Sequence, residues 1–151
     1  MTYRSILVGT DGSSTSFRAV DRAASLAGDT GAVLVLVSAY HPMPEKERLT
    51  ASDTLGDLAY KVQGATPAED VLRAARERAI AAGAKQVEEI AVEGDAVDVL
   101  SNVAREKGVD LVVVGNRGLN SLAGRLLGSV PANLSHKSPV DVLIVHTTDG
   151  K

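Results

Sequence analysis

The feature that most limits the possible folds of this chain is a glycine pattern that follows an apolar run. Residues 112–114 are all valine, Gly115 and Gly118 follow, and nine residues later come Gly128 and Ser129. Glycines let the main chain adopt positive φ and let an anion approach backbone N–H groups without meeting a Cβ. A helix that begins at Ser129 would add unpaired N–H donors and the positive end of its dipole. The pattern therefore predicts a buried strand that opens into an anion site built from main chain.

Pro131, two residues after Ser129, suits the first turn of such a helix, where a missing N–H is tolerated. The N–H groups of Gly128, Ser129 and Val130 are then expected to face a ligand. The alternative is that these glycines only form turns, because loops are rich in glycine and the chain has 14 glycines. Two other phosphate motifs are excluded. A Walker A loop needs a lysine before the hydroxyl residue and a spacing that Gly124 and Gly128 do not have, and no Gly-x-Gly-x-x-Gly follows the first predicted strand.

Length and composition narrow the class of protein. A chain of 151 residues predicts one domain, 1–151, and the 3% aromatic content predicts a core of aliphatic residues. The net charge of −3 and the scarcity of stacking aromatics argue against nucleic-acid binding. No apolar run predicts a membrane span or a secretory signal. The lack of cysteine excludes disulfides and thiolate metal sites and suits a reducing cytoplasm, which is the expected location.

Apolar runs and helical periodicity alternate along the chain. The runs predicted as strands are 5–9, 33–37, 87–92, 111–114 and 140–145. Four helices are predicted. The first has its cap at Ser13 or Ser14 and ends at Gly28, and the second begins with a capping box at Thr66 and ends at Gly83. The third has its cap at Asp95 and ends at Gly108, and the fourth begins at Ser129. Residues 40–64 predict a mobile surface excursion, and residues 147–151 a frayed tail.

This alternation predicts an α/β fold with one doubly wound, five-stranded parallel sheet and helices on both faces. In such sheets a ligand binds beyond the carboxyl ends of the strands, where the strand order reverses. The first predicted strand ends at 9–11 and the fourth at Gly115. If these two strands are neighbours, both ends face one crevice.

These motifs resemble those of the universal stress protein family. Gly115, Gly118, Gly128 and Ser129 match the family's nucleotide-binding pattern at its full spacing, 8–13 resembles its opening strand and acidic loop, and 139–145 resembles its closing strand. The run 124–133 is similar to small actinobacterial members, some of which bind cyclic AMP rather than ATP. The resemblance covers essentially the whole chain. It implies strand order 3-2-1-4-5 and an adenine nucleotide site.

The resemblance also assigns parts of a nucleotide to positions of this chain. It places Asp11 at the ribose or adenine, with Gly9 and Thr10 on the same wall, Ala39 at the adenine edge, Gly115 under the ribose, and Gly118, Gly128, Ser129 and Val130 at the phosphates. The chemistry agrees, because a carboxylate accepts hydrogen bonds from ribose hydroxyls and repels phosphate. Asp11 also suits a plain turn or a helix cap. Arg117 and Arg125 suit either phosphate pairing or a solvated loop.

Three functions remain open at this point. The favoured one is a regulatory or nucleotide-sequestering module that binds cyclic AMP or ATP, with Mg²⁺ if the ligand is ATP. The second is a slow ATP hydrolase or self-phosphorylating protein, which needs a positioned base, a metal and cationic clamps that no motif here supplies. The third is a structural role without a ligand. The three histidines have no metal-ligand spacing, and Ser129 has no motif to activate it as a nucleophile, so neither a metal site nor a catalytic residue is expected.

The last predicted strand also predicts assembly. Val140 to Val145 is apolar apart from Asp141, and the order 3-2-1-4-5 places it at a sheet edge. An exposed apolar edge pairs readily with another chain, so a two-fold homodimer through this strand is expected. The family resemblance implies the same. A monomer whose edge is covered by residues 147–151 is the alternative.

Overall fold

A computed structural model of the 151-residue chain describes residues 2–41, 65–116 and 129–147. It contains one five-stranded parallel sheet in the order β3-β2-β1-β4-β5. The strands are β1 (Ser5–Gly9), β2 (Val33–Tyr40), β3 (Gln86–Glu93), β4 (Leu111–Gly115) and β5 (Asp141–Val145). The helices are α1 (Ser14–Thr30), α3 (Ala65–Ala82), α4 (Ala96–Lys107) and α5 (Ser129–Lys137). The predicted doubly wound fold and its strand order are confirmed.

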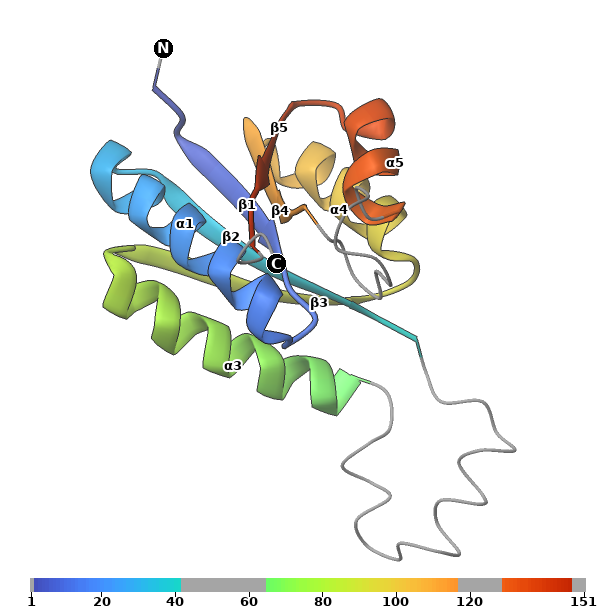
Figure 1. Ribbon diagram of the computed structural model, residues 1–151, viewed down its shortest axis with the longest axis horizontal. Helices are drawn as coiled ribbons and strands as arrows, with labels where there is room; N and C mark the ends of the chain where they lie inside the picture. The colour runs from blue at the N-terminus through green and yellow to red at the C-terminus, as the bar shows by residue number, and fades with distance from the viewer. Residues whose placement is uncertain (1, 42–64, 117–128, 148–151) are drawn as a thin grey trace, which may run out of the picture.

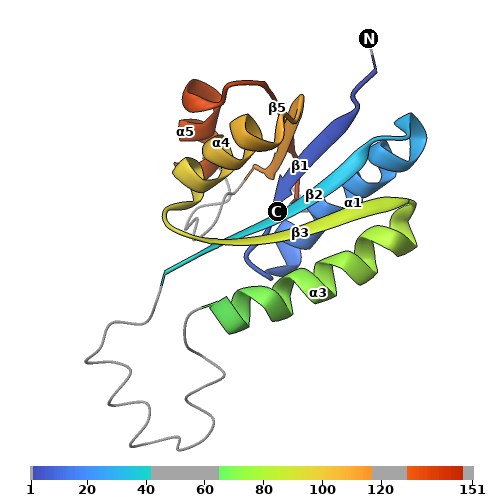
Figure 2. The same cartoon turned by 180° about the vertical axis from the view of Figure 1, so that it is seen from behind.

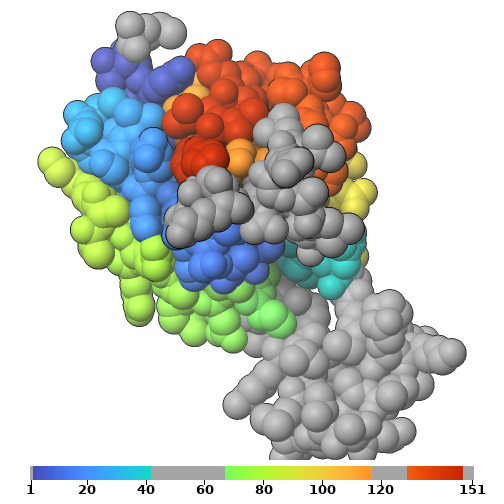
Figure 3. Space-filling view, viewed as in Figure 1, coloured from blue at the N-terminus to red at the C-terminus, as the bar shows by residue number. Residues whose placement is uncertain are grey.

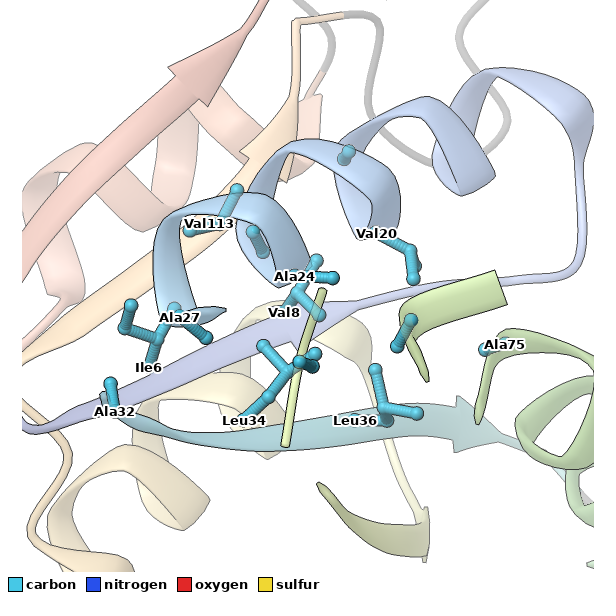
Figure 4. Close-up of a cluster of buried hydrophobic side chains, with 14 of the residues drawn as sticks. Ile6, Val8, Val20, Ala24, Ala27, Ala32, Leu34, Leu36, Ala75 and Val113 are labelled. Carbon is cyan, nitrogen blue, oxygen red and sulfur yellow. The ribbon is translucent and has the colours of Figure 1, made fainter. Parts of the chain in front are cut away.

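Helices cover both faces of the sheet. Figures 1 and 2 show α1 and α3 on one face and α4 and α5 on the other. Successive side chains of a strand point to opposite faces, so each face has its own apolar cluster. In β1, Ile6 and Val8 join the cluster under α1 and α3 (Figure 4), whereas Leu7 joins the cluster under α4 and α5. Because both faces are covered, the central strands are apolar throughout.

The strand order reverses between β1 and β4. From β1 the sheet is extended by β2 and β3 on one side and by β4 and β5 on the other. The two central strands are in direct register, with Val8 opposite Val113. All five strands are parallel, so their carboxyl ends share one edge of the sheet. The crevice predicted for a ligand lies at this edge.

The predicted end of the first helix was wrong. Helix α1 continues through Gly28 to Thr30, and its cap is Gly31, which has φ 75° and donates its N–H to the Ala27 carbonyl. Gly28 instead lies against the residue that follows α3, where a Cβ would come 2.4 Å from the Gly83 carbonyl oxygen. The glycine is needed for close helix packing. At the other end of α1, the predicted cap Ser13 is confirmed and accepts a hydrogen bond from the Ser16 N–H.

The ends of α3 and α4 mostly follow the sequence pattern. Gly83 and Gly108 directly follow them, as predicted, and α3 begins at Ala65, so Thr66 lies in its first turn rather than before it. Asp95 has the extended backbone of an N-cap, but its side chain makes no capping hydrogen bond. Its carboxylate lies 3.3 Å from His41 instead.

The carboxyl end of β5 is more ordered than predicted. Thr147 is 1% exposed, and both its N–H and its Oγ1 donate to the Asn116 side-chain oxygen, at 2.8 and 3.0 Å. Arg18 of α1 donates to the Thr147 carbonyl at 3.1 Å. The tail prediction is therefore wrong at Thr147, because this residue connects β4, β5 and α1. Residues 42–64 and 148–151, also predicted mobile, lie outside the described residues.

No helix within the described ranges combines the length and the apolarity that a membrane crossing requires.

Candidate nucleotide site

A cleft of about 500 Å³ lies at the carboxyl edge of the sheet. Four segments line it: the β1–α1 connection, the end of β2, the β3–α4 turn and one side of α5. Figure 3 shows α5 and the end of β2 on the same flank of the molecular surface. Four residues that the family pattern assigns to a nucleotide line the cleft together: Asp11, Ala39, Ser129 and Val130.

The first turn of α5 lies at the cleft, where the sequence predicts an anion site. Ser129 and Val130 are its first two residues, and the first N–H groups of a helix have no hydrogen-bond acceptor within that helix. Pro131 is buried in the same turn, where its missing N–H costs no hydrogen bond. The positive end of a helix dipole favours an anion, so the predicted phosphate contacts of Ser129 and Val130 are compatible with this position.

Thr10 shapes the acidic loop from behind. It is 1% exposed, and its Oγ1 lies 2.7 Å from the Ser16 hydroxyl and accepts from the Gly12 N–H at 3.1 Å. Its own N–H donates to the Val37 carbonyl at 3.0 Å. Thr10 is thus anchored to both β2 and α1, and the following residue, Asp11, is held at the cleft.

Asp11 combines a turn role with an exposed position. Its Oδ1 accepts the Ser13 N–H at 2.9 Å, which closes an Asx turn before α1. The residue is exposed and lines the cleft. A carboxylate accepts several hydrogen bonds, so the turn leaves capacity for ligand hydroxyls.

The two strand-end glycines Gly9 and Gly115 have packing reasons to be glycine. A Cβ on Gly9 would lie 3.0 Å from Leu100 Cδ2, and one on Gly115 would lie 2.9 Å from Thr147 Cγ2. Neither glycine nor Thr10 is among the cleft-lining residues. Their direct contact with a ligand stays a prediction. The remaining predicted positions, Arg117, Gly118 and Gly128, lie outside the described residues, as does Arg125.

One wall of the cleft has no counterpart in the sequence analysis. It consists of the β3–α4 turn and the first residues of α4, Gly94 to Asp98, and Asn133 and Lys137 of α5 line the same cleft. Lys137 lies 3.9 Å from Asp98, and His41 lies 3.3 Å from Asp95, so side-chain contacts connect α5 with α4 and the end of β2 with the turn. The signal in the sequence is the spacing of four from Ser129 to Asn133 to Lys137, which places them along one side of a helix.

Within 2–41, 65–116 and 129–147, no three His, Asp or Glu side chains are grouped to hold a metal ion. The carboxylate of Asp95 lies 3.3 Å from His41, and that of Asp98 lies 3.9 Å from Lys137.

The comparisons with known proteins agree with this fold. The model of the universal stress protein family matches residues 2–146. The chain is 56% identical to universal stress protein Rv1636 of Mycobacterium tuberculosis over 146 residues, which cover 97% of this chain and 98% of the relative. It is 32% identical to universal stress protein YxiE of Bacillus subtilis, over 95% of this chain and 99% of the relative.

Solved structures show the same similarity. A crystal structure of a universal stress protein in complex with cAMP is 44% identical, with a TM-score of 0.76 over 98% of this chain and 100% of that chain. An Archaeoglobus fulgidus universal stress protein in complex with dAMP has a TM-score of 0.67 at 20% identity, over 95% and 98% of the two chains, which supports the fold alone. The chain belongs to the universal stress protein family.

Proposed function

We propose that this protein binds an adenine nucleotide, cyclic AMP or ATP, and acts as a regulatory or nucleotide-sequestering module. One observation carries the proposal: Asp11, Ala39, Ser129 and Val130 come from three separate segments and line one cleft. Its volume of about 500 Å³ is within the range of small-molecule sites. The 44% identical universal stress protein in complex with cAMP supports the choice of ligand class.

Each part of a nucleotide has a matching part of the cleft. The phosphate belongs at the first turn of α5, where Ser129 and Val130 offer N–H groups and the helix dipole favours an anion. The ribose belongs at Asp11, because a carboxylate accepts hydroxyl hydrogen bonds. Gly118 and Gly128, from the family pattern, complete the phosphate side of this proposal.

Binding without hydrolysis is the favoured activity. Phosphoryl transfer to water needs a group that orients the water, a metal and cations at the transferred phosphate. The carboxylates of Asp95 and Asp98 face His41 and Lys137 instead. If ATP is the ligand, Mg²⁺ would enter with its phosphates. Product release from ATP and Mg²⁺ over hours would reveal the alternative, slow hydrolysis or self-phosphorylation.

Calorimetric titration with ATP, ADP, AMP and cyclic AMP tests the proposal. We expect at least one of them to bind the parent protein and binding to be lost in Gly118→Val and Gly128→Val, because a Cβ at either glycine would occupy phosphate space. Ser135→Val, on an exposed position of α5 outside the cleft lining, is the control and should bind normally. Normal affinity in both glycine variants, with unchanged circular dichroism, would refute the site.

We also propose that the protein is a homodimer joined through the last strand, Val140 to Val145. The edge position of β5 supports this, as do Val142, Leu143 and Ile144, which are only half-buried within one chain. Antiparallel pairing of β5 with its copy would satisfy the edge and cover these side chains. We propose no nucleic-acid partner and no membrane partner, and the predicted location is the cytoplasm.

A further inference from the structure

Strand β3 forms one edge of the described sheet (Figure 2). It pairs with β2 along its whole length, from Gln86 opposite Val33 to Glu93 opposite Tyr40. The next residue, Gly94, donates its N–H to the Tyr40 carbonyl at 2.9 Å and therefore faces β2. Backbone groups of successive strand residues point to opposite sides, so every second residue before Gly94 also faces β2. The residues between them present their N–H and C=O groups to the free edge: Val87, Glu89, Ala91 and Glu93.

Only the first part of this outward row is covered by described residues. Arg76 of α3 donates to the Val87 carbonyl at 3.1 Å, as expected for an outward-facing group. Within the described ranges, no hydrogen bond occupies the outward backbone groups of Glu89, Ala91 and Glu93. A row of unpaired N–H and C=O groups is a template for another strand.

A hollow of about 420 Å³ lies beside this edge, between the end of β3 and α4. Its apolar part consists of Val92, Val99 and Val103. No lysine or arginine is among the described residues that line it, and the carboxylate residues of the lining are Glu93, Asp95, Asp98 and Glu106. The hollow adjoins the nucleotide cleft at the β3–α4 turn, whereas Glu106 lines the hollow alone.

The charges of this surface distinguish between possible occupants. Glu93 and Glu106 have no cationic partner within the described part of the chain. A second copy of β3 would bring Glu88 and Glu89 against the same edge, and like charges placed opposite one another are destabilising. Phosphate groups of nucleic acids or membranes are repelled for the same reason. A segment that carries lysine or arginine is attracted.

We propose that the free edge of β3 binds an extended basic segment of a partner protein, which adds to the sheet as a further strand. The backbone of the segment pairs with the outward groups of Glu89, Ala91 and Glu93. Every second side chain of such a strand points to the α4 side. A lysine or arginine there places its aliphatic stem on the apolar part of the hollow and its charge near Glu106.

Amide hydrogen exchange measured by NMR tests strand addition. The probe is an end-blocked peptide of alternating lysine and threonine that matches the 8 residues of β3. We expect saturating peptide to slow exchange roughly tenfold at Glu89, Ala91 and Glu93, because these amides enter a ladder. Ile90 already faces β2 and is the internal reference. Unchanged exchange at all three outward amides would overturn the proposal.

Two N-methylated probes separate backbone pairing from charge attraction. One carries the methyl groups on its lysine nitrogens in the main chain, and the other carries them on its threonine nitrogens. Alternate N–H groups of an extended strand point to opposite sides, so one probe should fail to bind and the other should bind. Equal, parent-like binding of both would overturn strand addition. A peptide with glutamate in place of lysine should give no protection, and equal protection by it would overturn the basic partner.

Glu106→Lys and Glu77→Lys are matched variants, because both change the net charge equally. Glu106 lines the hollow, whereas Glu77 is exposed on α3 outside that lining. We expect Glu106→Lys to weaken binding of the lysine peptide roughly fivefold, as for one exposed ion pair, and Glu77→Lys to bind like the parent. An equal loss in both variants would overturn the site, because binding would then follow net charge alone. Assemblies larger than a dimer in sedimentation equilibrium, with the outward amides protected without peptide, would assign the edge to a second copy and overturn the basic partner.

Discussion

The helix contact between Gly28 and Gly83 leads to a prediction in which two physical effects have opposite signs. Gly28 is the third-last residue of α1, inside the helix. A Cβ added there would lie 2.4 Å from the Gly83 carbonyl oxygen and 2.9 Å from its carbon. The first distance is about 1 Å short of ordinary van der Waals contact. Both atoms are backbone, so no side-chain rotation relieves the overlap.

Helix propensity and packing can be weighed against each other for Gly28→Ala. Alanine within a helix is favoured over glycine by about 1 kcal/mol. Overpacking a tight contact costs about 1–3 kcal/mol when the backbone has to move. Relief here requires α1 to move away from the backbone that follows α3. We expect packing to prevail, because the overlap is with backbone, with a net loss of up to about 2 kcal/mol in the free energy of unfolding.

Urea unfolding followed by far-ultraviolet circular dichroism measures this change. Ser25→Ala is the control, because Ser25 is exposed on the same helix and its replacement should change stability by no more than about 0.5 kcal/mol. A Gly28→Ala protein as stable as the parent, or more stable, would refute the close helix contact and leave propensity as the dominant effect.

Three further predictions concern the site, the pH dependence and the assembly. Asp11→Ala should weaken nucleotide binding by about 1–3 kcal/mol, because a ligand hydroxyl loses its charged partner; unchanged calorimetric affinity would leave Asp11 as a turn residue only. A hydrogen bond to Asp141 raises the pKa of Tyr3 above 10.0, so its stabilising contribution is complete below that pH and is lost as pH rises through the folded-state pKa. Tyr3→Phe should remove this alkaline loss, and urea midpoints that fall equally in both proteins would contradict it. Val142→Pro should remove a ladder donor of β5 and shift dimer toward monomer in sedimentation equilibrium, whereas a variant as dimeric as the parent would exclude this interface.

Much of the fold was predictable because its signals are local. A continuous apolar run such as 33–37 specifies a strand covered on both faces, and helical periodicity bounded by glycine specifies the helices between strands. Gly28 shows the limit of this reasoning. In the sequence, a glycine near the end of an apolar period resembles a C-cap. Only the position of α3 and of the residue after it shows that Gly28 allows a close backbone contact. Thr147 is similar, because its polar side chain is buried by partners that are distant in sequence, Asn116 and Arg18.

The site was predictable where strand ends determine it. Asp11 follows β1, and Ala39 lies at the carboxyl end of the neighbouring parallel strand β2, so the topology alone brings them to one edge. The β3–α4 turn and the polar side of α5 were not predicted, because their approach depends on how α4 and α5 lie on the sheet. The positions of α4 and α5 are fixed by side-chain packing over the whole face of the sheet, and no short sequence motif predicts them.

Gly115 shows how packing and ligand contact can be separated at one glycine. Its replacement by alanine would place a Cβ 2.9 Å from Thr147 Cγ2 and displace a residue that contacts Asn116 and Arg18. Lost binding in Gly115→Ala alone therefore has two explanations. Thr147→Ser removes Cγ2 and keeps the hydroxyl that donates to Asn116, so the double variant should regain the stability that the single variant loses.

The double variant then answers the question about the ligand. If Gly115 lies under the ribose, as the family pattern implies, the added Cβ still occupies ligand space. Gly115→Ala with Thr147→Ser should then fold like the parent in urea titrations and bind cyclic AMP at least tenfold more weakly, a loss of about 1.4 kcal/mol. Thr147→Ser alone is the control and should bind normally. Full recovery of affinity in the double variant would show that Gly115 is glycine for the sake of Thr147, and that the ribose lies elsewhere in the cleft.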